Sequence, residues 1–169
     1  VAGDEMNDSI ATYLKKVHNL VVGERTAEEI KIRIGSAFPT DDFDMTSMDV
    51  RGLHLLSGLP RSINLKAGDL REAMSEPLNK IVEAVKRTLE RTPPELAADI
   101  VDRGIMLAGG GALVRGISDL LSHETGIFTH VAEEPLLCVV KGCGLVLDDF
   151  KRLRKVVDTP DFARNAVRD

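Results

Sequence analysis

The chain has 169 residues, with 22 lysines and arginines against 27 acidic residues and a formal net charge of −5. This length is enough for about one ordinary domain or a pair of subdomains. The acidic excess argues against a general nucleic-acid binder, which needs a basic surface. Aromatic residues make up only 4% of the sequence and tryptophan is absent, which argues against a base-stacking surface. No apolar run approaches the roughly 20 residues that span a bilayer.

The first third of the chain is predicted to be mainly helical. From Glu5 to Val21, apolar residues recur at helical spacing, and Gly23 is expected to stop this helix. Thr26 and Glu29 have the spacing of a capping box, which predicts the start of a second helix. Pro39 is expected to end that helix.

The middle of the chain is predicted to change from strands to helices. Residues 40–48 are acidic and turn-rich, and Met48–Leu65 is expected to form two or three short antiparallel strands. Asp69 is a candidate cap for the following helix, and Pro77 predicts a short helix followed by a longer one. The sequence Thr92-Pro93-Pro94 is the clearest break and the candidate boundary between two subdomains.

The last third alternates between helix and strand. We expect a short helix at 95–101, a strand at 105–108, a helix at 112–122, a strand at 127–131 and a helix at 134–147. This order predicts parallel strands covered by helices, which is an α/β arrangement. Cys138 and Cys143 are interpreted as buried free thiols. The four histidines are scattered and lack partners at zinc-ligand spacing.

Three consecutive glycines, Gly109, Gly110 and Gly111, lie between the predicted strand and helix. Glycines at such a turn allow a sharp bend and a close approach of backbone to ligand, and a helix start favours a polar or anionic group. No Gly-Lys-Ser/Thr follows, and Val114 occupies the third glycine position of a dinucleotide fingerprint, so neither of those motifs fits. The alternative is a tight turn that binds nothing.

Glu28 and Lys31 are three residues apart, so they share one face of a helix. A carboxylate beside an ammonium group can bind a diol, because one accepts and the other donates hydrogen bonds. The alternative is a surface ion pair. No nucleophile and base stand together in a catalytic spacing, so no catalytic residue and no metal ligand is predicted in this chain.

Several segments taken together resemble the bacterial actin family of MreB, which includes the magnetosome protein MamK. The resemblance covers nearly the whole chain up to about Leu147. The matching segments are Val1–Met6, Val22–Ile32, Ile34–Ala37, Val50–Gly52, Gly58–Pro60, Arg91–Leu96, Asp102–Gly104, Leu107–Gly116, Glu133–Leu136, Cys138–Val140 and Gly142. The hairpin segment Leu53–Ser57 departs from the pattern, because it is more apolar than is usual there. Ala2 also stands where a second glycine is common.

The resemblance implies the actin-like ATPase fold, an α/β, ribonuclease H-like fold with two related domains around an ATP cleft. This chain, which begins inside a running element, would be part of the second domain of a longer protein. Residues 1–92 would form its α+β outer subdomain and residues 93–157 an incomplete inner subdomain. Residues 158–169 would be a frayed C-terminal tail. The phosphate loops and the acidic residues that bind magnesium would precede Val1.

The resemblance also implies a nucleotide site for ATP or ADP with Mg²⁺ in the longer protein. The glycine turn would pack against adenosine, the charged pair would reach the ribose and base, and the N-terminal glycine would lie near the phosphates. The implied binding residues are Gly3, Glu28, Lys31, Gly109, Gly110, Gly111, Leu113 and Val114.

The function implied is that of an ATP-dependent filament protein with weak ATPase activity, which maintains rod cell shape by organising cell-wall synthesis. The alternatives are a magnetosome-aligning filament of the MamK type, a non-polymerising ATPase of the actin, chaperone and sugar-kinase superfamily, and a non-catalytic interaction module. Implied partners are other copies of the protein and membrane-associated morphogenesis proteins, at the cytoplasmic face of the membrane. Nucleic acid is not expected as a partner. Direct membrane insertion by this segment is not expected either, because the family's membrane-binding segment belongs to the first domain.

Overall fold

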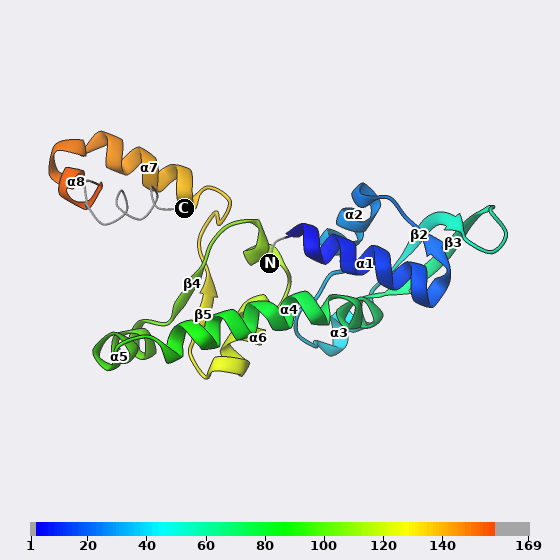
Figure 1. Cartoon of the computed structure of the whole chain (residues 1–169), viewed down its shortest axis with the longest axis horizontal. Helices are drawn as coiled ribbons and strands as arrows, with labels where there is room; N and C mark the ends of the chain where they lie inside the picture. The colour runs from blue at the N-terminus through cyan, green and yellow to red at the C-terminus, as the bar shows by residue number, and fades with distance from the viewer. Residues whose placement is uncertain (1–2, 158–169) are drawn as a thin grey trace, which may run out of the picture.

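The computed structural model describes residues 3–157, which form two groups of helices around separate sheets (Figure 1). The predicted tail at 158–169, and Val1 and Ala2, lie outside the described residues.

The first sheet has three antiparallel strands in the order β1 (Leu20–Val21), β2 (Ser47–His54) and β3 (Pro60–Lys66). Val50 pairs with Ile63, and both Val50 and Leu65 are buried. Apolar side chains alternate with exposed ones along these strands, as they do in a sheet with one covered face. The antiparallel strands predicted from the sequence are therefore confirmed.

Three helices bury their apolar stripes with this sheet: α1 (Gly3–His18), α2 (Glu24–Ile34) and α4 (Ala67–Glu90). A one-turn helix, α3 (Asp41–Asp44), lies in the segment predicted as acidic turns and packs on α4. The large, fully buried side chains of this core include Ile10, Leu14, Leu20, Ile30, Val50, Leu65, Leu70 and Met74.

The first predicted helix ends earlier than expected. Helix α1 stops at His18, and Asn19 takes a left-handed conformation with φ of 50°. Asparagine tolerates that conformation better than most residues, so it ends helices much as glycine does. Leu20 and Val21 then pair with β2, and the prediction that Val21 belongs to the helix is wrong.

The predicted capping box is also wrong. Helix α2 begins at Glu24 after Gly23, which makes no side-chain cap, and Thr26 already lies in the first turn. The main-chain N–H of Ala27 donates to the Gly23 carbonyl at 3.0 Å. The helix ends at Ile34 rather than at Pro39, because Gly35 leaves the helical conformation.

Pro77 does not divide the next helix. Helix α4 runs as one helix of 24 residues with Pro77 buried inside it. Its core stripe of Met74, Leu78 and Val82 continues on both sides of the proline, so tertiary packing outweighs the local cost of the lost hydrogen bond. Asp69 lies in the first turn, and the cap position is occupied by Lys66.

The second sheet pairs β4 (Ile105–Leu107) with β5 (Thr129–Val131) in parallel, as predicted. Along the chain, helix α5 (Pro94–Arg103) precedes β4, and helix α6 (Ile117–Thr125) connects β4 to β5. The predicted helix at 112–122 is instead a short 3₁₀ helix, η1 (Gly110–Leu113), followed by α6. Gly116 separates them with φ of 73°.

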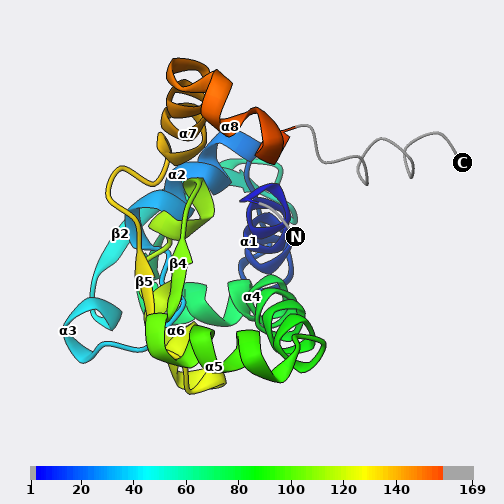
Figure 2. The same ribbon diagram turned by 90° about the vertical axis from the view of Figure 1, so that its left-hand side faces the viewer.

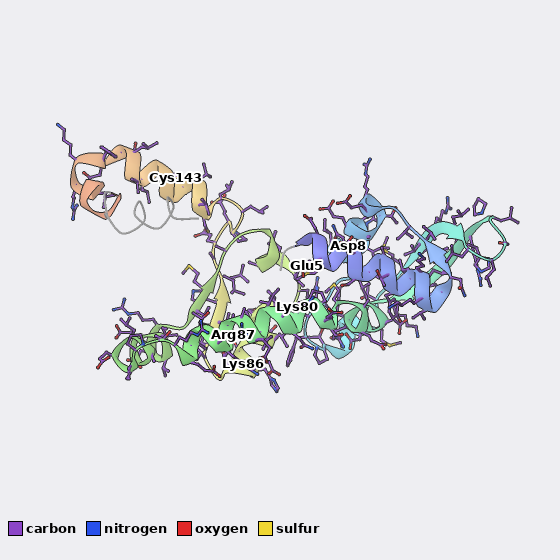
Figure 3. The ribbon with its side chains drawn as sticks, viewed as in Figure 1. Glu5, Asp8, Lys80, Lys86, Arg87 and Cys143 are labelled. Carbon is purple, nitrogen blue, oxygen red and sulfur yellow. The ribbon has the colours of Figure 1, made fainter. Side chains whose placement is uncertain are left out.

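The last two helices, α7 (Cys138–Asp148) and α8 (Phe150–Val157), lie at one end of the molecule in both views (Figures 1 and 2). Helix α7 begins later than predicted and has no buried residue. Cys138 is half-buried and Cys143, labelled in Figure 3, is exposed, so their predicted burial is wrong, although both are free thiols.

Candidate functional site

Helix α2 carries the charged side of the candidate site. Ala27, Ile30 and Ile34 face the core, which leaves Glu28 exposed and Lys31 half-buried at the edge of the apolar stripe. The Lys31 ammonium group donates to the Gly3 carbonyl at 3.1 Å, over 28 positions of sequence. This bond fixes the lysine head between α2 and the first turn of α1.

The glycine turn after β4 forms the opposite side. Gly109 has φ of 84° and ψ of 176°, a conformation open essentially to glycine alone. Its N–H donates to the Pro135 carbonyl at 2.8 Å, which ties the turn to the segment before α7. A Cβ atom added at Gly111 would meet nothing within 4 Å, and one added at Gly110 would meet only Leu136 at 3.5 Å. The turn therefore faces open space.

Two loops hold these sides together. Ser36 forms a parallel bridge with Arg115, and the Ala37 N–H donates to the Arg115 carbonyl at 2.8 Å. The buried Ser36 hydroxyl donates to the Phe38 carbonyl at 2.8 Å. These bonds join the end of α2 to the end of η1, which sets the spacing between the charged helix face and the glycine turn.

The two sides line one open cavity of 840 Å³. Seven of the eight predicted site residues line it, namely Gly3, Glu28, Lys31, Gly110, Gly111, Leu113 and Val114. Gly109 shapes the turn and is not among the lining residues. In Figure 1 the start of α1 lies beside the segment after β4, and both segments contribute residues to the lining of the cavity.

Six further residues line the cavity and were missed by the sequence reasoning: Asp4, Met6, Ile32, Gly35, Arg115 and Leu136. A Cβ at Gly35 would lie 2.2 Å from the Lys31 carbonyl oxygen, a close approach that only the structure reveals. The Arg115 guanidinium stacks 4.0 Å from the centre of the Phe43 ring, a tertiary contact that spacing does not reveal. Met6 had no signal apart from its place on an apolar stripe.

The chemistry of the cavity suits a ligand that is apolar on one part and rich in hydroxyl groups on another. Glu28 accepts and Lys31 donates hydrogen bonds, while Ile32, Leu113 and Leu136 present exposed apolar side chains. Within residues 3–157, no three histidine, cysteine or carboxylate side chains gather as a metal site.

Comparison with known sequences connects this geometry to a family. The family model described as MreB/Mbl protein matches residues 1–155. The chain is 44% identical over 155 residues to the cell shape-determining protein Mbl of Bacillus subtilis, covering 92% of this chain and 46% of that protein. It is 46% identical over 148 residues to the cell shape-determining protein MreB of Escherichia coli, covering 88% of this chain and 42% of that protein. The chain thus spans about half the length of these relatives.

Solved structures agree with this match. MreB5 of Spiroplasma citri bound to AMPPNP superimposes with a TM-score of 0.85 at 34% identity, covering 92% of this chain and 46% of that one. The same protein bound to ADP has a TM-score of 0.84 at 32% identity, covering 94% and 47%. A MamK double helical filament has a TM-score of 0.65 at 16% identity, covering 80% and 41%, which shows a shared fold alone. The predicted actin-like fold is confirmed, and the chain belongs to the MreB/Mbl family.

Proposed function

We propose that this chain is part of an ATP-dependent, actin-like filament protein that maintains rod cell shape by organising cell-wall synthesis. Support comes from the Mbl and MreB relatives, which are named cell shape-determining proteins and match at 44% and 46% identity. The MamK alternative is not favoured, because MamK resembles this chain at only 16% identity. No described feature favours a non-polymerising ATPase or an isolated interaction module.

Within this proposal the 840 Å³ cavity holds the nucleoside part of ATP or ADP. The observation that carries it is the convergence of Glu28 and Lys31 from α2 with Gly110 and Gly111 from the turn after β4. The structurally similar MreB5 was solved with AMPPNP and with ADP. A nucleoside matches the cavity because it joins a flat apolar base to a diol.

Each side of the cavity has a role in this binding. The Glu28 carboxylate accepts hydrogen bonds from ribose hydroxyls, and the Lys31 ammonium group donates to the ribose or base. The glycine turn lets the purine approach the backbone, with Leu113 and Val114 against adenosine. Gly3 lies near the phosphates, at the start of α1, where free N–H groups favour an anion.

Hydrolysis and magnesium belong to the longer protein in this proposal. The charged residues of the cavity include two carboxylates, those of Asp4 and Glu28, and no nucleophile with its base. We therefore derive no magnesium ligand and no hydrolytic step from this chain. A weak ATPase with Mg²⁺ would need residues outside it.

The proposal also divides the chain, with an outer subdomain at 1–92 and an inner one at 93–157. The antiparallel sheet lies in the first range and the parallel pair in the second, which supports this division. Helix α4 belongs to the first range by sequence but reaches the second sheet group through α6 (Figure 1). In this proposal, copies of the longer protein associate into protofilaments. They also contact membrane-associated morphogenesis proteins at the cytoplasmic face of the membrane. None of the described helices is long and apolar enough to cross a membrane.

Photolabelling with 8-azido-ATP tests the nucleotide site, because it captures weak binding to the chain. Trypsin releases most of the glycine turn as Gly104–Arg115 and the acidic face of α2 as Thr26–Lys31. We expect label in both peptides, suppressed by excess ADP. The variant Glu28→Gln should reduce labelling about tenfold, the loss expected for a hydrogen bond to a charged group.

Glu29→Gln is the matched control. Glu29 is the next residue of the same helix, pairs with Arg33 at 2.9 Å and does not line the cavity, so labelling should be unchanged. Equal labelling of both variants, or label spread over other peptides, would contradict the assigned site.

Filament formation is tested by sedimenting the full-length protein with ATP. Protein that stays monomeric at every concentration would contradict that part.

A further inference from the structure

The segment that joins β5 to α7, residues 133–137, lies along the glycine turn and is here called the strap. Just before it, the Ala132 N–H donates to the Leu107 carbonyl at 2.9 Å, which continues the pairing of β5 with β4. Further along, the Gly109 N–H donates to the Pro135 carbonyl at 2.8 Å. In Figure 1 the strap leads from β5 to α7 beside the segment that follows β4. The position of the strap is therefore fixed relative to the glycine turn.

Glu134 gives the strap its shape through an uncommon backbone conformation. Its φ is 49°, in the left-handed region that residues other than glycine, asparagine and aspartate seldom adopt. Its carbonyl accepts a hydrogen bond from the Leu137 N–H at 2.8 Å, and its carboxylate pairs with the Lys141 ammonium group of α7. Because this left-handed residue directly precedes Pro135, it sets the direction in which the rest of the strap meets the glycine turn.

Leu136 brings an apolar side chain from the strap to the candidate site. It lines the 840 Å³ cavity and is 65% exposed, so it contributes little to the core. A Cβ atom added at Gly110 would lie 3.5 Å from the Leu136 Cδ2 atom, which places the leucine directly beside the turn. A leucine side chain has no hydrogen-bond donor or acceptor, so it favours one base over another only through the apolar area that it covers.

We propose that the strap makes the cavity select purine over pyrimidine nucleotides, with Leu136 as a specificity-determining residue and Glu134 as a positioning residue. This inference rests on the proposed nucleotide site and adds how that site chooses its base. With the ribose held at Glu28 and Lys31, the two fused rings of a purine reach Leu136 and cover it, whereas the single ring of a pyrimidine ends short of it. Without the left-handed turn at Glu134, Leu136 would leave its place beside Gly110 and this difference would be lost.

Competition photolabelling measures this selectivity on the chain itself. With 8-azido-ATP far below saturation, the concentrations of ADP and of CDP that halve the labelling report the affinity of each nucleotide. For the unmodified chain, we expect ADP to compete about tenfold better than CDP, because the purine buries more apolar area. Leu136→Ala should weaken competition by ADP about fivefold and competition by CDP less than about twofold, which narrows the ratio between the two.

Leu137→Ala is the matched control for Leu136→Ala. Leu137 is the next residue of the strap, is also exposed and does not line the cavity, so its truncation should leave both competition values unchanged. A ratio of ADP to CDP affinity that Leu136→Ala does not narrow would overturn the inference, while label in the glycine-turn and α2 peptides would still support the nucleotide site. Absence of label from both peptides of the unmodified chain would overturn the site and the inference together.

Two substitutions of Glu134 test its positioning role. Both remove the ion pair with Lys141, but glycine adopts the left-handed conformation freely and β-branched valine resists it. Glu134→Gly should therefore keep the ratio of ADP to CDP affinity of the unmodified chain, and Glu134→Val should narrow it as Leu136→Ala does. Circular dichroism should show the same helix content in both variants, because α7 beyond the strap has no buried residue. Equal ratios for the glycine and valine variants would overturn the positioning role of Glu134.

Discussion

At the scale of single residues, the consecutive glycines differ in their backbone conformation and in the space around them. Gly109 takes a conformation that side chains rarely adopt, and its N–H is bonded to Pro135. Gly111 has an ordinary φ and faces open space within the cavity. One glycine therefore makes the turn possible and the other leaves room beside it.

This difference predicts that alanine destabilises the chain much more at position 109 than at position 111. Gly109→Ala should lower the free energy of unfolding by about 1–3 kcal/mol, because the added Cβ strains the backbone. Gly111→Ala should change it by less than about 0.5 kcal/mol. Urea denaturation followed by circular dichroism measures both. A Gly111 variant as unstable as the Gly109 variant would show that the turn is closed against a neighbour.

At the scale of the element, helix α4 organises the core. Its side chains at Leu70, Met74, Leu78 and Val82 are buried along one stripe that passes Pro77. The sequence around Pro77 predicts two helices, and the packed structure has one. The apolar stripe is worth more than one missing main-chain hydrogen bond, since each buried side chain contributes about 1.5–3 kcal/mol.

Truncation of a methionine tests how much the apolar stripe of α4 contributes to the free energy of unfolding. Met74 is fully buried on α4, and Met74→Ala should destabilise the chain by about 2–5 kcal/mol through lost burial and a cavity. Met45→Ala is the control, because Met45 is 71% exposed and its loss should cost little. Thermal unfolding of both variants compares them. Similar melting temperatures would show that the core collapses around the cavity or that Met74 is not packed.

At the scale of the whole molecule, an ion pair helps to join the two groups of elements. The Lys86 ammonium group of α4 lies 2.7 Å from the Glu124 carboxylate of α6, with Lys86 labelled in Figure 3. The hydrogen bond from Lys86 lowers the pKa of Glu124, with the lysine's charge as the next cause and His123 adding to it. The same bond raises the pKa of Lys86. Both shifts favour the charged pair in the folded chain.

The sign of the pH dependence follows from the lowered pKa of Glu124. Its stabilising effect is complete above the ordinary carboxyl pKa of 4.5 and is lost as the pH falls through the lower folded value. Glu124→Gln should therefore reduce the melting temperature slightly at pH 7, and this reduction should shrink as the pH falls below 4.5. The effect is small because the pair is solvent-exposed. A melting-temperature difference between Glu124→Gln and the unmodified chain that does not shrink at acidic pH would contradict this origin.

Local patterns in the sequence were enough to predict the amphipathic helices, the antiparallel strands, the parallel strand pair and the resemblance to the family. These depend on periodicity and on local motifs, which are contained within short segments. It also singled out Glu28, Lys31 and the glycine turn as candidates, because their chemistry is visible one segment at a time.

Other features depend on contacts between segments that are far apart in the sequence. Helix α1 ends at the left-handed residue Asn19, and Leu20 and Val21 then form a strand because they can pair with β2. The cysteines are less buried than predicted because α7 lies outside the packed core and none of its residues is buried. The cavity between residues some eighty positions apart depends on the bonds between Ser36, Ala37 and Arg115. Contacts over such sequence distances are set by packing and hydrogen-bond satisfaction across the whole chain, which no local pattern encodes.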